Sequence, residues 1–390
     1  MSHKSGYRAA VALLTIAAAA AACAEPAVGP VPPISAAVAT LSSTPASLGW
    51  HERARALVAA NNLSPLAAAR VYAALSVAQY RAVGGSVFGG RRALEENRGA
   101  VAGASVTVLS FFFPAARASL EQQVLDEGDA GPGRMHPGYG DGVEMGRTAG
   151  TAMVDRVRQD GFTTPWTGTV PVGPGLWIAN GPPAGATFGG VAPYFLSAGS
   201  QFRPASPPAF GSPAFLADLS EIRDLSATRT PEQRAVAVYW NFSTGSFTPP
   251  GYWDLVTANY ITAHGLDEEA ATRVFALTTG AMMDALIACW DAKYYYWMLR
   301  PSHADASITL TFGLPNHPSY PSGHSCASAA AATVLTAQFP EQSTELAAWV
   351  SEAGLSRMYA GIHYRFDITA GRDLGVTVAQ WALAHPERIR

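Results

Sequence analysis

The chain has 390 residues, of which 48% are hydrophobic and 14% are charged, and its formal net charge is -3. This length and apolar content are enough for a large buried core and suggest one big domain or two. The balanced charge, without a basic stripe, argues against nucleic acid as a partner.

The chain begins like an export signal. Lys4 and Arg8 precede an apolar run over residues 9–22, which is too short for an ordinary membrane span and typical of a signal peptide. We therefore expect residues 1–23 to be a signal peptide and the protein to be exported from a bacterial cytoplasm, to the periplasm or the medium. Cleavage before Cys23 would leave a lipid anchor on that cysteine; cleavage at an Ala-x-Ala site is the alternative.

The segment after the signal is predicted to be a linker. Residues 24–48 are rich in Ala, Pro, Ser and Thr and have no apolar period. No later segment reaches the roughly 18 uninterrupted apolar residues of a transmembrane helix. We therefore expect no membrane-spanning segment in the mature protein.

An N-terminal helical part is predicted over residues 49–160. Ser64-Pro65 is typical of a helix start, because serine caps the first turn and proline fits its first position. Apolar residues that recur every three or four positions predict further helices. The predicted helices cover residues 65–83, 103–125 with a break at Pro114, and 142–160.

Residues 161–214 break the helical pattern. Proline and glycine are dense there, and aromatic residues recur without a period. A loop of this length is uncommon unless it is functional or well packed. We expect an ordered excursion over the helices that shapes the mouth of a pocket; a long surface loop is the alternative.

A C-terminal helical part is predicted over residues 215–390. Thr230 and Gln233 fit a capping box with a proline inside it. Strand-like alternation is absent from the sequence, so we predict an all-α fold, a helical bundle with two sub-bundles. The predicted helices here cover residues 231–241, 252–264, 267–299, 323–339, 342–360 and 366–384.

The first of three charged blocks contains Lys293 and Arg300-Pro301. In a helix that runs to residue 299, Lys293 and Arg300 lie two turns apart on one face. The residues between them are mostly aromatic. We therefore expect both cations to be partly buried and to need an anion, and a solvated charged face is the alternative.

The second block, from Pro321 to His324, enters an alanine-rich helix. The free N–H groups and positive dipole end of a helix bind oxyanions well, and Gly323 lets the backbone approach closely. His324 would lie in the first turn, with a side chain suited to proton transfer. A helix cap with an incidental histidine is the alternative.

The third block contains Ser356-Arg357, His363 and Asp367. Tyr359 to Gly361 indicates a bend. His363 and Asp367 are four residues apart, and a carboxylate on one imidazole nitrogen makes the other a better nucleophile or ligand. A capping role for Asp367 is compatible with this one.

Together, Lys-x6-Arg-Pro, Pro-Ser-Gly-His and Ser-Arg-x5-His-x3-Asp resemble the superfamily of type 2 phosphatidic-acid phosphatases, class A acid phosphatases and vanadium-dependent haloperoxidases. The resemblance is strongest over residues 285–375 and implies the helical fold of that superfamily. It also implies a site in which vanadate or phosphate is bound by a set of five residues, namely Lys293, Arg300, Ser322, Gly323 and Arg357.

The same resemblance implies roles for three further residues. His363 would be the covalent partner, as axial vanadium ligand in a peroxidase or phosphoryl acceptor in a phosphatase. His324 would be the acid–base residue, and Asp367 would orient His363. Lys293 would also polarise the bound substrate.

Two residues outside these blocks favour the peroxidase. Trp290 and His317 stand where haloperoxidases of this superfamily tend to place a tryptophan and a second histidine, a possible halide pocket. We predict a vanadate-dependent haloperoxidase that oxidises halide with hydrogen peroxide. The alternatives are an exported acid phosphatase that hydrolyses phosphate monoesters without vanadate, and a non-enzymatic oxyanion-binding lipoprotein.

Cys289 and Cys326 lie in apolar stretches near the blocks. Two small core residues and a single bridge between them are both compatible with the sequence.

Overall fold

The computed structural model describes residues 44–84, 90–129, 134–243 and 245–390, which fall within one compact unit, Ala39–Arg390. The predicted signal peptide, the predicted lipidation of Cys23 and most of the predicted linker lie outside the described residues. Within those ranges the regular structure is helical apart from two isolated β-bridges, one of them between Leu176 and Met298. The predicted all-α fold is confirmed.

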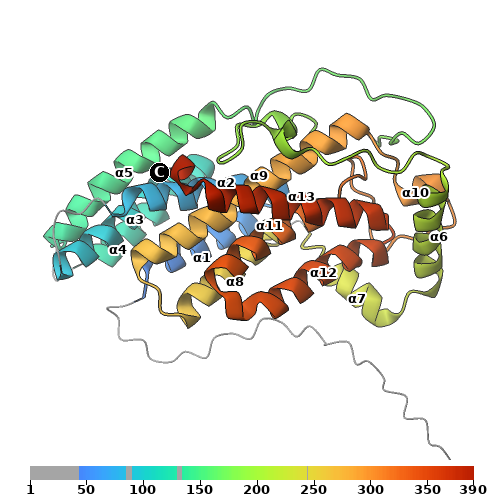
Figure 1. Cartoon of the computed structure of the whole chain (residues 1–390). Helices are drawn as coiled ribbons and strands as arrows, with labels where there is room; N and C mark the ends of the chain where they lie inside the picture. Colours follow the sequence, from blue (N-terminus) through green and yellow to red (C-terminus); the bar gives the residue numbers. More distant parts are fainter. Residues whose placement is uncertain (1–43, 85–89, 130–133, 244) are drawn as a thin grey trace, which may run out of the picture. The chain divides into compact units, whose positions relative to one another are not determined.

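Five helices form the first sub-bundle (Figure 1). In α3 and α5, glycines let the two backbones touch. A Cβ on Gly142 would lie 2.0 Å from the Glu96 carbonyl oxygen, and one on Gly103 would lie 2.1 Å from that of Val143. The helices are α1 (Ala46–Ala60), α2 (Pro65–Ala82), α3 (Arg91–Phe112), α4 (Arg117–Gly128) and α5 (Pro137–Arg158).

Helix α1 is absent from the predicted elements and begins inside the predicted linker. Its N-cap is Pro45, which has no capping side chain. The Glu268 carboxylate takes that place and accepts hydrogen bonds from the Ala46 and Ser47 amides at 2.6 and 3.1 Å. Because Glu268 is more than 200 residues away in the chain, no local signal marks this helix start.

The second sub-bundle surrounds α9 (Glu268–Tyr296), which packs against α2, α8, α11 and α13. By length and composition α9 could cross a membrane, but it is almost entirely buried inside the protein. The other helices are α6 (Pro213–Thr228), α7 (Pro231–Tyr239), α8 (Thr248–Ala263), α10 (Pro301–Ala304), α11 (Gly323–Gln338), α12 (Ser343–Tyr359) and α13 (Arg365–Ala384). The predicted capping box at Thr230 and Gln233 is present.

The predicted helix over residues 267–299 ends too late. The α9 helix stops at Tyr296, Trp297 adopts a left-handed conformation with φ 52°, and Arg300 is the N-cap of the short α10. Lys293 and Arg300 therefore do not share a helix face, and the prediction based on their spacing is wrong. A left-handed non-glycine residue has no sequence signal as clear as that of glycine.

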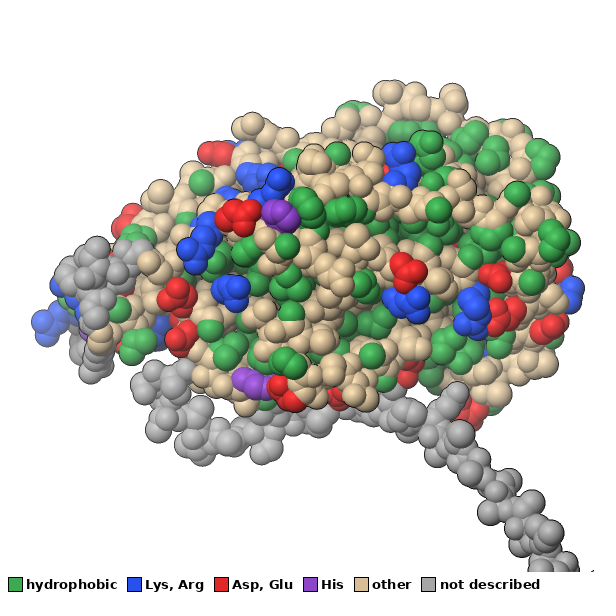
Figure 2. Space-filling model, viewed as in Figure 1, with side chains coloured by type: hydrophobic (Ala, Val, Ile, Leu, Met, Phe, Trp, Pro, Cys, Tyr) green, Lys and Arg blue, Asp and Glu red, His purple; other side chains and the backbone are tan. Residues whose placement is uncertain are grey.

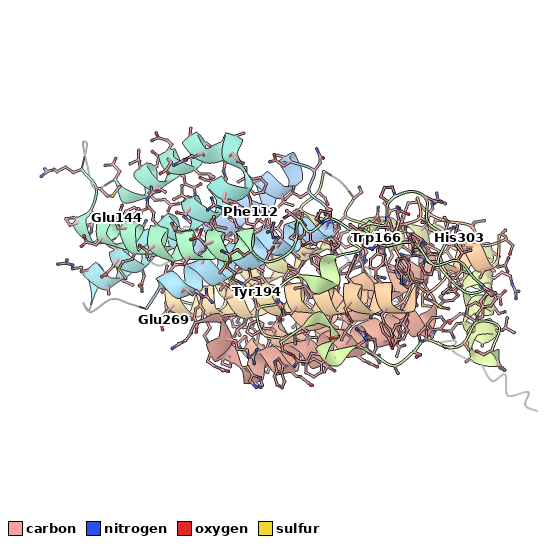
Figure 3. The ribbon with its side chains drawn as sticks, turned by 90° about the horizontal axis from the view of Figure 1, so that it is seen from above. Phe112, Glu144, Trp166, Tyr194, Glu269 and His303 are labelled. Atoms are coloured by element: carbon pink, nitrogen blue, oxygen red, sulfur yellow. The ribbon has the colours of Figure 1, made fainter. Side chains whose placement is uncertain are left out.

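The excursion, residues 161–212, is irregular apart from two 3-10 turns at Phe188–Gly190 and Gly199–Phe202. The buried Asp284 carboxylate of α9 accepts three of its backbone N–H groups, those of Tyr194, Phe195 and Leu196, at 2.7 to 2.9 Å. Trp166 packs against Trp297 at the other end of the helix (Figure 3). The predicted ordered excursion over the helices is what the structure shows.

Acidic and basic side chains are interspersed on the face drawn in Figure 2. A broad basic patch of the kind that binds nucleic acid is not seen on that face.

Candidate active site

Three cationic side chains from the predicted blocks are buried in the second sub-bundle. Lys293 and Arg300 are fully buried and Arg357 is 1% exposed. Each comes from a different place in the fold: the last turns of α9, the start of α10 and the end of α12. Long cationic side chains are almost never fully buried unless paired, so this cluster is unusual.

The Lys293 ammonium lies under the loop that leads into α11. Its Nζ donates to the carbonyl oxygens of Pro318, Ser319 and Pro321 at 2.9, 2.8 and 2.5 Å. These three bonds use all three ammonium donors. An oxyanion bound by Lys293 would therefore have to replace one of these carbonyls.

The Arg300 guanidinium joins two histidines. Its Nη1 donates to the Ile362 carbonyl oxygen at 2.7 Å and to His363 Nε2 at 3.1 Å. Its Nη2 donates to Nδ1 of His317 at 3.0 Å. Arg300 thus links the 315–321 loop to the turn between α12 and α13.

Arg357 approaches from α12. Its Nε donates to the Ser356 hydroxyl at 3.0 Å, and its Nη2 donates to the Ala237 carbonyl oxygen at 2.9 Å. The Phe312 ring lies 5.2 Å from the guanidinium carbon. Burial lowers the pKa of Arg357, and the positive charge of Arg300 lowers it further.

His363 and Asp367 form the predicted pair. His363 Nδ1 donates to Asp367 Oδ2 at 2.8 Å, which leaves Nε2 with its lone pair. Asp367 is the third residue of α13 and also accepts from the Tyr364 amide, so it is a capping residue as well. The bend before His363 is present, with Gly361 at φ 78°.

The second block forms the start of α11, as predicted. Ser322 is the N-cap, and it bonds the amides of Ser325 and Cys326. The amides of Gly323 and His324 belong to the open first turn of the helix. A Cβ on Gly323 would lie 3.0 Å from the Trp290 ring, so a larger residue here would require that ring to shift.

His324 lies in that first turn. Its Nε2 is 2.8 Å from the Trp240 carbonyl oxygen, so Nε2 carries the hydrogen and Nδ1 is the atom that can accept a proton. Burial, with Arg357 next in size, lowers the pKa of His324 well below its usual value. Burial, with Arg300 and Lys293 next in size, also lowers the pKa of His363 well below its usual value.

The structure also brings Trp290 and His317 to the cluster. Their ring centroids are 5.0 Å apart, and Nζ of Lys293 lies 5.5 Å from the Trp290 ring. Trp290 is 6% exposed. His317 Nδ1 lies 3.0 Å from Arg300 Nη2 and 3.2 Å from the Pro318 carbonyl oxygen.

The cluster carries more buried positive than negative charge. Burial lowers the pKa of Lys293 to about 8, of Arg300 to about 10 and of Arg357 to about 9. The one carboxylate among the residues described above, Asp367, has its pKa raised by burial to about 6. Buried charge is costly without a counter-charge, so a bound anion would stabilise this arrangement.

Two functional residues were missed by sequence reasoning. The Ser319 hydroxyl donates to Asp367 Oδ2 at 2.5 Å, and Asp284 anchors the excursion. Ser319 lies two residues before the second block, between His317 and Pro321, so its closeness to that block was a usable signal. Asp284 has no such signal, because an isolated aspartate inside an apolar helix gives no indication of its partner.

Cys289 and Cys326 are both buried free thiols. They do not form the bridge that the sequence left open. Cys289 Sγ donates to the Pro321 carbonyl oxygen at 3.7 Å, which places it beneath the cluster.

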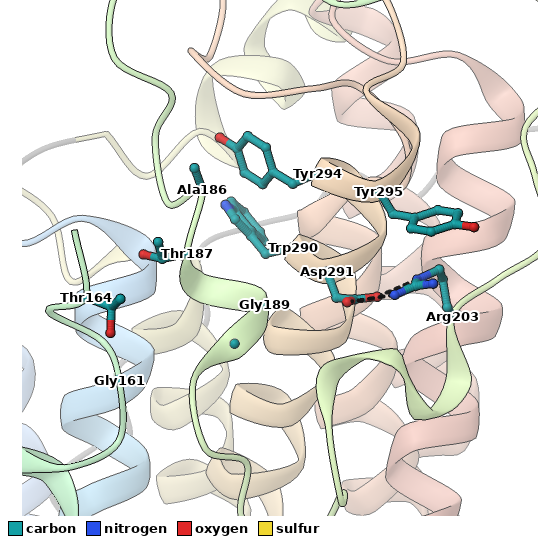
Figure 4. A pocket seen from close by; sticks show the side chains of 11 residues that line it. Gly161, Thr164, Ala186, Thr187, Gly189, Arg203, Trp290, Asp291, Tyr294 and Tyr295 are labelled. Carbon is teal, nitrogen blue, oxygen red and sulfur yellow. Dashed lines mark hydrogen bonds and ion pairs between the residues drawn. The ribbon is translucent and has the colours of Figure 1, made fainter. Parts of the chain in front are cut away.

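A pocket of about 430 Å³ lies between the excursion and α9. Figure 4 shows its wall of Trp290, Tyr294 and Tyr295. Trp290 is the one residue that this pocket shares with the cluster. The excursion forms one side of this pocket.

Residues 272–389 match the family model described as PAP2 superfamily. Over 97 residues the chain is 37% identical to a non-specific acid phosphatase of Salmonella typhi and 36% identical to one of Salmonella typhimurium. Each alignment spans 24% of this chain and 39% of the phosphatase.

The fold is similar to those of vanadium-dependent peroxidases over most of the chain. A bacterial vanadium-dependent iodoperoxidase matches with a TM-score of 0.72 and 23% identity, covering 87% of this chain and 96% of that one. An apo-type bacterial vanadium-dependent chloroperoxidase matches with a TM-score of 0.68 and 16% identity, covering 84% and 95%. These matches show a shared fold.

Proposed function

We propose that the protein is a vanadate-dependent haloperoxidase that oxidises halide with hydrogen peroxide. One observation carries the proposal: the excess of buried positive charge around His363, whose Nε2 lone pair is fixed by its bond to Asp367. A tetrahedral oxyanion would supply the missing negative charge, and its bond to Nε2 would replace the hydrogen bond that Nε2 accepts from Arg300 Nη1. The similarity of the whole fold to two vanadium-dependent peroxidases supports vanadate as that oxyanion.

The residues fit vanadate by their chemistry. His363 Nε2 would ligate the vanadium, and Arg300, Arg357 and the Ser322–Gly323 start of α11 would bind its oxygens. Bound vanadate would supply Lewis-acid activation of hydrogen peroxide. The Gly323 and His324 amides, in the open first turn of α11, would donate to a vanadate oxygen.

The remaining work falls to residues of the chain. His324 would take the proton of hydrogen peroxide at Nδ1, since its Nε2 hydrogen is held by the Trp240 carbonyl. Lys293 would hold the 318–321 loop in place, and it would polarise a vanadate oxygen by exchanging one of its three carbonyl acceptors for that oxygen. Trp290 and His317 would border the halide site, and His317 would also hold Arg300.

The second candidate is a phosphatase. The chain is 37% identical to an acid phosphatase over 97 residues, and the same geometry suits phosphate. His363 Nε2 would attack phosphorus, and His324 would protonate the leaving alcohol. This reaction needs no vanadate.

One pair of assays separates these functions. Protein loaded with orthovanadate is expected to brominate a phenol dye when bromide and hydrogen peroxide are present, and to lose this activity without vanadate. Rapid hydrolysis of 4-nitrophenyl phosphate by the vanadate-free protein, with no bromination after loading, would show that the protein is a phosphatase instead. Inactivity in both assays would favour an oxyanion-binding protein.

Export is proposed on the sequence of residues 1–24 alone. The intact mass of the mature protein is expected to begin at Cys23 with a lipid or after Ala24. A mature protein that retains Met1 through Ala22 would contradict export.

A further inference from the structure

The pocket between the excursion and α9 has a fixed shape. A Cβ on Gly189 would lie 2.6 Å from the Asp291 backbone, so the excursion backbone rests directly on α9. Trp290 Nε1 and the Tyr294 hydroxyl both donate to the Ala184 carbonyl oxygen, at 3.2 and 2.7 Å. The pocket wall is therefore held from both sides.

The charges in this pocket are already paired. Arg203 donates to both carboxylate oxygens of Asp291, at 2.7 and 3.0 Å, and its guanidinium carbon lies 3.9 Å from the centroid of the Tyr295 ring (Figure 4). A charged ligand would have to break this pair. The pocket thus favours an uncharged ligand.

The other lining groups favour an aromatic ligand with a hydroxyl group. Trp290 and Tyr294 offer ring surfaces from α9, and the Thr164 and Thr187 side chains lie across from them on the excursion (Figure 4). Ring surfaces bind other rings, and hydroxyl groups fix their orientation. A volume of about 430 Å³ is within the range of small-molecule sites.

One indole separates this pocket from the cluster. Trp290 lines the pocket, and its ring also contacts Gly323, where a Cβ would lie 3.0 Å away, and His317. We propose that the pocket binds an uncharged phenol that accepts the oxidised halogen, a proposal that rests on the proposed peroxidase function. Hypohalous acid would transfer its halogen to a ring carbon; the C–H and O–halogen bonds break, a C–halogen bond forms, and the released proton and hydroxide give water.

Binding can be tested without any catalysis. In the absence of vanadate, halide and peroxide, 2-naphthol is expected to bind saturably by isothermal titration calorimetry, and cyclohexanol is not. Ala186→Trp, which fills the pocket, is expected to weaken 2-naphthol binding at least tenfold. Ala118→Trp, on the exposed side of α4, is the matched control and is expected to leave it unchanged.

A second, smaller substitution keeps the test valid if Ala186→Trp fails to fold. Thr187→Val keeps the side-chain shape and removes the hydroxyl, so it is expected to weaken 2-naphthol several-fold and leave naphthalene binding unchanged. Equal 2-naphthol affinity in the wild type and Ala186→Trp, or no saturable binding to the wild type, overturns the proposal. Formation of triiodide from iodide and peroxide needs no organic acceptor, so it tests the peroxidase function separately.

Discussion

Asp367 receives hydrogen bonds from three directions, and this fixes the His363 imidazole. Its Oδ2 accepts from the Ser319 hydroxyl, the Tyr364 amide and His363 Nδ1. The Asp367 carbonyl oxygen accepts from the Ser322 amide at 3.0 Å. One residue thus ties the helix start that would hold the oxyanion to the histidine that would bind it.

Asp367→Asn tests this link. Asn can present an N–H group to His363 Nδ1 and so favour the wrong tautomer, and we expect vanadate affinity to fall about 10- to 100-fold. Orthovanadate titration measures it, with the exposed Asp155→Asn as control. Unchanged vanadate affinity in Asp367→Asn would show that Asp367 does not orient His363.

At the scale of elements, the sequence predicts most helices of the second sub-bundle to within a few residues, because caps and apolar periods are local. The start of α11 at Ser322 is marked by such a local signal. The end of α9 is different, because a left-handed Trp297 and contacts with the excursion determine it. The two arginines could be named from their motifs, whereas the partners that bury them are backbone carbonyls far along the chain.

Asp284 is the anchor between α9 and the excursion, and its charge makes that anchor sensitive to pH. Burial, opposed by three backbone hydrogen bonds, raises the pKa of Asp284 to about 6 from the usual 3.8. A group whose pKa is higher in the folded than in the unfolded protein stabilises the fold fully at a pH below its unfolded pKa. This stabilisation is lost as the pH rises through its folded pKa.

We therefore expect the free energy of unfolding of the wild type, relative to Asp284→Asn, to fall between about pH 4 and pH 6 and to level off above that. Urea denaturation across this range measures it, since asparagine does not titrate. A difference that rises with pH would show that the three hydrogen bonds outweigh burial.

At the scale of the whole molecule, a buried charge cluster joins the N-terminal helix to the second half of the chain. Asp254 of α8 pairs with His51 and Arg55 of α1, each at 2.5 Å. His51 Nε2 also contacts the Gln79 amide oxygen of α2 at 3.1 Å. Sequence reasoning missed this cluster because its members are up to about 200 residues apart in the chain.

Asp254→Asn removes the negative charge between the buried His51 and the half-buried Arg55, and we expect it to lower the free energy of unfolding by about 3 kcal/mol. Asp155→Asn, which removes an exposed pair with Arg158 on α5, is expected to change it by less than about 1 kcal/mol. Chemical denaturation measures both. Equal effects of the two substitutions would show that the buried cluster adds nothing to stability.

The central claim is that His363 holds vanadate in the cluster of buried cations. Vanadium content after loading and exhaustive dialysis tests it most directly, with elemental analysis of the wild type and His363→Ala side by side. We predict about one vanadium per chain in the wild type and none above background in the variant. Equal vanadium in both proteins, or none in either, would contradict the claim.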